Sequence, residues 1–94
     1  MNKKHVYKYR LKKIMEQDIL LPSDAKILSV EEQRGDIVLY ALVDYDAPAE
    51  ITLDRRRIYI YCTGSEVHNP LARFIGTVKL GGGEYMFHVF ESTP

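Results

Sequence analysis

Arginines and tyrosines alternate along residues 55–62 (RRRIYIYC). Because successive side chains of an extended strand point to opposite faces, this spacing gathers one set on the outward face: Arg55, Arg57, Tyr59 and Tyr61. Guanidinium groups offer forked donors to phosphates, and tyrosine rings offer flat surfaces on which bases stack. The pattern predicts a binding face for a ligand with phosphates and bases. A solvated sheet face, where both residue types are favoured for their β propensity, explains it equally well.

Two further segments extend this candidate binding face. Thr63 and Gly64 follow the strand directly, and a glycine there lets backbone N–H groups approach an anion. The first thirteen residues hold six bases and no acid, which suits contact with phosphates, although lysines on an edge strand also prevent aggregation. The complete predicted ligand-binding set is Tyr7, Arg10, Arg55, Arg57, Tyr59, Tyr61, Thr63 and Gly64.

No combination of residues predicts catalysis. A nucleophile needs a base beside it and a third group to orient that base. Cys62 alternates with Ile58 and Ile60, so we expect a buried and unreactive thiol. His88 stands between Phe87 and Val89, which is typical of a core or half-buried histidine. One cysteine and three histidines make no structural zinc site, so we expect no catalytic residue, no metal and no cofactor.

Alternation with period two runs through most of the chain and predicts short strands. Residues 14–21 fit either a helical turn or a strand, and the DAPA segment at 46–49 is expected to break the sheet. Arg34-Gly35 predicts a tight hairpin with Gly35 at positive φ, and the three glycines at 81–83 predict a second one. The expected strands are 5–11, 26–33, 36–44, 55–62, 74–80 and 85–91.

These elements indicate one all-β (or β-rich α+β) domain over residues 1–94. The expected architecture is a small antiparallel sandwich or open barrel of about six short strands. Residues 36–44 are apolar on both faces, which is typical of a central strand. The 46% hydrophobic and 28% charged residues are ordinary for a folded domain. A lone cysteine and the lack of any membrane-length apolar run predict a protein of the cytoplasm.

Four blocks of the sequence resemble a family of small phage and prophage proteins. The blocks are AKILSVEEQRGDIVLYALVD (25–44), DAP (46–48), TG (63–64) and FIGTVKLGGGEYMFHVFE (74–91). The chain departs from the family pattern at Tyr45, where a proline is common, and at Cys62, where a small residue is common. Residues 65–67 (SEV) replace a His-Pro-Ile-like stretch, so a ligand role for that loop does not carry over.

This family is similar to phage sponge proteins that capture the cyclic nucleotide signals of CBASS antiphage defence. The resemblance implies a non-enzymatic protein that binds 3′3′-cyclic GMP-AMP within a homo-tetramer in the cytoplasm of the infected bacterial host. Two other functions fit the residues. One is a small β-barrel protein that binds single-stranded nucleic acid, which the zero net charge disfavours. The other is a phage protein–protein interaction module.

Overall fold

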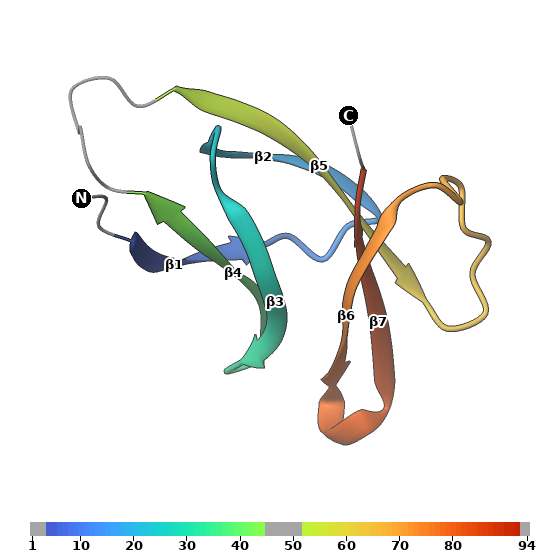
Figure 1. Ribbon diagram of the computed structural model, residues 1–94. Helices are drawn as coiled ribbons and strands as arrows, with labels where there is room; N and C mark the ends of the chain where they lie inside the picture. Colours follow the sequence, from blue (N-terminus) through green and yellow to red (C-terminus); the bar gives the residue numbers. More distant parts are fainter. Residues whose placement is uncertain (1–3, 45–51, 93–94) are drawn as a thin grey trace.

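The computed structural model describes residues 4–44 and 52–92, which form two antiparallel sheets (Figure 1). One sheet has the order β1-β4-β3 and the other β2-β5-β7-β6, and the two do not close into a barrel. The expected all-β sandwich is confirmed, with seven strands in the described residues instead of about six. These strands are β1 (Lys4–Leu11), β2 (Glu16–Pro22), β3 (Lys26–Gln33), β4 (Asp36–Asp44), β5 (Leu53–Cys62), β6 (Arg73–Leu80) and β7 (Tyr85–Glu91).

The additional strand comes from the segment whose sequence fitted both a helical turn and a strand. Residues 16–22 pair with the first part of β5 as an edge strand, with Asp18 opposite Arg57. Tertiary pairing therefore decides a local preference that the sequence leaves open. The DAPA segment at 46–49 lies outside the described residues.

Both predicted hairpins are present. Arg34 and Gly35 join β3 to β4 with φ angles of 52° and 84°, so both central residues have the positive φ of a type I′ turn. Gly81–Gly83 form the short 3-10 turn η2 between β6 and β7, where all three glycines have positive φ. These turns set the register of the strand pairs that they join.

The core lies between the two sheets. The side chains of β4 that face inward are at most 1% exposed: Ile37, Leu39, Ala41 and Val43. Ile58 and Ile60 from β5 and Val89 from β7 cover them from the opposite sheet. β4 is the central strand of its sheet, as predicted, and even Val38 on its outer face is only 3% exposed.

The sheets come closest where β3 crosses β6. A Cβ atom on Gly76 would lie 3.0 Å from Cγ2 of Val30, so only glycine fits at this crossing without a shift. The pairing of β6 with β7 also shifts register between Phe74 and Gly76. This contact fixes the distance between the two layers.

The predicted burial of Cys62 is wrong, because its side chain is exposed. Cys62 does alternate with Ile58 and Ile60, but it is the last residue of β5, and the core cluster on this strand ends at Ile60. Period-two alternation gives the face of a strand and does not give the length over which another layer covers that face.

In the described ranges no helix has the length and apolar character needed to cross a membrane.

Candidate ligand-binding site

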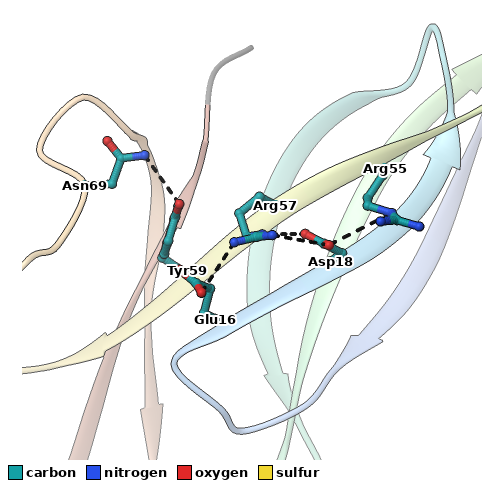
Figure 2. A network of polar contacts seen from close by, with 6 residues as sticks. All are labelled: Glu16, Asp18, Arg55, Arg57, Tyr59 and Asn69. Carbon is teal, nitrogen blue, oxygen red and sulfur yellow. Dashed lines mark hydrogen bonds and ion pairs between the residues drawn. The ribbon is translucent and has the colours of Figure 1, made fainter.

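Arg55 and Arg57 lie on the outer face of the four-stranded sheet and are held by carboxylates from β2 (Figure 2). Arg57 Nε donates to Asp18 Oδ1 at 2.5 Å, and its Nη1 lies 3.4 Å from Glu16 Oε2. Arg55 Nε lies 4.0 Å from Asp18 Oδ2. Asp18 thus fixes one guanidinium firmly and reaches the other only loosely.

The pairing of Asp18 with Arg57 shifts the pKa of both groups. The hydrogen bond from Arg57 lowers the pKa of the Asp18 carboxyl, and the positive charges of Arg57 and Arg55 lower that pKa further. The hydrogen bond to Asp18 raises the pKa of Arg57 in turn. Asp18 and Arg57 are therefore both charged near neutral pH.

Arg55 is the more available of the two, because 74% of its side chain is exposed. It borders a cavity of about 310 Å³, lined by Asp54, Arg55, Arg56, Arg57 and Ser92. This cavity forms because β5 is longer than β7. β5 pairs with β7 only over residues 58–62, and Ser92 N then donates the last hydrogen bond, to Arg57 O.

A second cavity of about 330 Å³ adjoins the first, since Asp54, Arg56 and Ser92 line both. In it Glu91 is 5% exposed, and its carboxylate oxygens accept hydrogen bonds from Arg56 and from Arg73 Nη2, the latter at 3.0 Å. Arg56 Nη1 also donates to the carbonyl of Ala25 at 3.1 Å. We call the two cavities together the arginine groove; its cations are Arg55, Arg56, Arg57 and Arg73.

Sequence reasoning did not assign Arg73 and Glu91 to the site. A signal for Glu91 exists, because period-two alternation places it on the inward face with Phe87 and Val89. A buried carboxylate needs a positively charged partner, so the position of Glu91 in an apolar series indicates that a cation pairs with it. No local pattern indicates that Arg73, eighteen residues earlier, is one of them.

The expectation that Tyr59 and Tyr61 offer free stacking surfaces is wrong. They do lie on the face opposite Ile58 and Ile60, but Tyr59 is 9% exposed and Tyr61 is 2% exposed.

The segment after β5 and the aromatic residues of β7 cover both rings. Asn69 Nδ2 donates to the Tyr59 hydroxyl at 3.5 Å, and His68 N donates to the Tyr61 hydroxyl at 3.2 Å (Figure 2 shows the first). Phe90 packs edge-on against Tyr61 with 5.7 Å between ring centroids. These tyrosines form a second, smaller core on the outer face.

Thr63 and Gly64 lie at the other end of β5 from the arginine groove. Thr63 Oγ1 is 2.8 Å from His88 Nε2, and Thr77 Oγ1 is 2.9 Å from His88 Nδ1, so both ring nitrogens of this half-buried histidine have partners. Gly64 has a φ of 92° in the turn that Ser65 N closes on Cys62 O at 3.0 Å. The Thr63 hydroxyl, both His88 ring nitrogens and the turn at Gly64 are therefore hydrogen-bonded within the chain at this end of β5.

Tyr7 and Arg10 both lie on β1 in the three-stranded sheet, and their side chains are on opposite faces of that sheet. Tyr7 pairs with the core residue Ala41 and lies on the inward face, where its ring stacks on His5 at 6.1 Å. Arg10 pairs with Val38 and lies on the outer face, 3.5 Å from Asp36 Oδ2. Within one chain the structure does not bring either residue to the arginines of β5.

The described residues contain no group of three or more His, Cys, Asp or Glu side chains that could hold a metal ion. The site is thus a cluster of carboxylate-paired guanidinium groups on a small β sandwich, and Arg55 is its most exposed member. Guanidinium groups are donors that suit anions. The chain belongs to the family described as Domain of unknown function (DUF7352), whose family model matches residues 2–94. No curated protein and no solved structure shows significant similarity to it.

Proposed function

We propose that the protein is a non-enzymatic phage immune-evasion protein that binds and sequesters a cyclic dinucleotide signal of host CBASS defence, of the 3′3′-cyclic GMP-AMP type. The observation that carries the proposal is the arginine groove. Four arginines line its adjoining cavities together with Asp54 and Glu91. The carboxylates of β2 contact Arg57 closely, whereas Arg55 has only a 4.0 Å contact with Asp18 and stays available to an anion. The resemblance of the 25–44 and 74–91 blocks to phage sponge proteins supports the choice of ligand.

The guanidinium donors of the groove suit a ligand with two phosphodiesters, each of which carries one negative charge. Guanidinium groups recognise phosphate oxygens through paired N–H donors, and Asp18 and Glu91 hold Arg57 and Arg56 in place before a ligand arrives. Such pre-positioning lowers the entropy cost of binding. Sequestration needs affinity and no chemical step, so the groove is sufficient without a nucleophile.

The bases need a surface other than the faces of Tyr59 and Tyr61, which are covered. Guanidinium planes stack on aromatic rings, and Arg55 is exposed enough to do so. Leu20, which is 57% exposed and pairs with Arg55 across the strands, adds an apolar surface beside it. Arginine stacking thus takes the role that the sequence suggested for tyrosine.

The proposed sponge acts as a homo-oligomer, with the tetramer that the resemblance implies, in the cytoplasm of the infected bacterium. The groove is open to solvent on one chain. A second copy that covers it would desolvate the ligand and strengthen every charge contact made to it. Oligomerisation therefore supports tight capture by a chain of 94 residues.

The test is calorimetric titration of the protein with 3′3′-cyclic GMP-AMP. Arg55→Ala and Arg57→Ala should each weaken binding roughly tenfold or more, because hydrogen bonds to charged groups contribute about 1.5–3 kcal/mol. Binding should weaken as salt rises. Arg10→Ala removes the same charge from the other sheet and serves as the matched control, with affinity unchanged.

Three outcomes would contradict the proposal. In the first, wild-type protein fails to bind any cyclic dinucleotide. In the second, a short single strand binds with higher affinity than the cyclic ligand, which would favour a nucleic-acid-binding protein. Recovery of chemically altered nucleotide after incubation would show turnover and exclude simple sequestration.

A further inference from the structure

A second basic pocket lies on the outer face of the three-stranded sheet, at the end where β3 turns into β4. It has a volume of about 290 Å³ and is lined by Lys8, Arg10, Gln33, Arg34, Asp36 and Val38. β1, the hairpin turn and the first residue of β4 supply its charges. Three cations and one carboxylate leave an excess of two positive charges around a small apolar floor.

Two of these cations are positioned by neighbours on adjacent strands. Lys8 Nζ donates to Gln33 Oε1 at 2.8 Å, so the lysine is oriented by a neutral group that leaves its charge uncompensated. Arg10 Nη1 lies 3.5 Å from Asp36 Oδ2, and 74% of its side chain is exposed. Cations that outnumber the carboxylates around one pocket repel one another, and a bound anion would reduce this repulsion.

Arg34 is the third cation of the pocket, and its backbone conformation is a separate indication that the pocket binds a ligand. Arg34 has a φ of 52°, and no other non-glycine residue among the described residues has a positive φ. Type I′ turns prefer asparagine or glycine at this position, because a larger side chain in the left-handed region is strained. Arg34 also makes no polar contact within the described chain that would offset this strain. A long cation at a position that favours asparagine indicates a use for the guanidinium outside the fold.

We propose that this pocket binds a small, multiply charged phosphate anion of the pyrophosphate type, independently of the arginine groove. The excess of two positive charges matches an anion with at least two negative charges, and the volume suits a phosphate or diphosphate group. The site lies on the other sheet and shares no lining residue with the groove. Its ligand is recognised through the phosphates alone.

The decisive variant is Arg34→Asn, because asparagine suits a type I′ turn better than arginine does. Calorimetry with inorganic pyrophosphate should show binding weakened roughly tenfold, while the melting temperature stays the same or rises. Lys26→Gln removes one positive charge at the far end of β3 and should leave pyrophosphate affinity unchanged. If Arg34 had no role in binding, Arg34→Asn would bind pyrophosphate with full affinity.

The two sites are separable by experiment. In ¹⁵N-labelled protein, pyrophosphate should shift the amide signals of residues 8–10 and 33–36 and leave those of 54–57 and 91–92 in place. Arg10→Ala should weaken pyrophosphate binding and spare the cyclic dinucleotide, whereas Arg55→Ala should do the reverse. The proposal is overturned if wild-type protein does not bind pyrophosphate, if Arg34→Asn binds it with full affinity, or if its signals move at the groove instead.

Discussion

Arg57 and Asp18 face the same side of the four-stranded sheet because β2 and β5 pair with these residues directly opposite each other. Opposite charges in such cross-strand pairs stabilise a sheet modestly, and exposed pairs contribute least. The larger effect of Asp18 is on ligand binding. Its carboxylate orients Arg57 but also offers the guanidinium an internal anion that competes with phosphate.

Asp18→Asn tests the contribution of this ion pair to stability. We expect little change in melting temperature at pH 7, because the pair is exposed to solvent. Since Arg57 lowers the pKa of Asp18 in the folded state, the carboxylate stabilises the fold above its unfolded pKa, which is about 4. That contribution is lost as pH falls through the lowered folded-state pKa. Denaturant midpoints of wild type and variant should therefore converge from pH 5 to pH 2, and a gap that widens on acidification would contradict the pairing.

Cys62 gives a second prediction at the scale of one residue. Its exposed side chain at the end of β5 should react with one equivalent of a thiol reagent in native buffer, without denaturant. Cys62→Ser, which lacks the only thiol of the chain, is the control and should not react. Labelling that requires unfolding would mean that another chain or segment covers this end of the strand.

At the scale of the elements, two turns and one close crossing set the architecture. The Arg34-Gly35 turn fixes the register of β3 against β4 and sets Gln33 opposite Asp36. The pairing of β1 with β4 brings Lys8 and Arg10 to the same pocket. The different lengths of β5 and β7 open the arginine groove at the opposite sheet. Both proposed sites therefore lie where a regular strand pairing stops.

Gly76→Val tests the crossing of β3 and β6. A Cβ at this position would already be 3.0 Å from Val30 Cγ2, so the valine should destabilise the fold by about 1–3 kcal/mol through overpacking. Chemical denaturation measures the loss. Val30→Ala removes the clashing methyl groups, and the double variant should lose less stability than the two single losses added together. Strict additivity would show that the two residues do not meet.

At the scale of the whole molecule, the chain leaves several large apolar side chains exposed. Leu71 is 83% exposed, and Leu53, Phe74 and Tyr85 are each more than half exposed. Exposed apolar area of this kind, in a domain of only 94 residues, favours association. The elongated sandwich, 44 by 28 by 18 Å, also presents edge strands that a second copy can pair with or cover.

Light scattering on the purified protein at micromolar concentration should give a mass of about four times the 10.9 kDa chain. Addition of 3′3′-cyclic GMP-AMP should leave that mass unchanged, because the sponge is expected to be assembled before it binds. A mass of one chain with and without ligand would contradict the oligomer and remove the proposed cover of the groove.

Much of the fold was determined by the sequence alone. Alternation with period two gave strands close to β1, β3, β4, β5, β6 and β7, and glycines gave both hairpin turns, because these are local properties of backbone and side-chain direction. The same alternation predicted the faces of β5 correctly, with Arg55, Arg57, Tyr59 and Tyr61 on the face opposite Ile58 and Ile60.

Only the tertiary structure decided which residues meet and which faces are covered. Tyr59 and Tyr61 are buried because the segment after β5 and Phe90 cover them. Cys62 is exposed because the core cluster on β5 ends at Ile60. Arg73 joins Arg56 through a buried glutamate, while Arg10 lies on another sheet. Burial and long-range contact depend on how layers stack and on where each strand pairing ends, and neither is encoded in the alternation of a single strand.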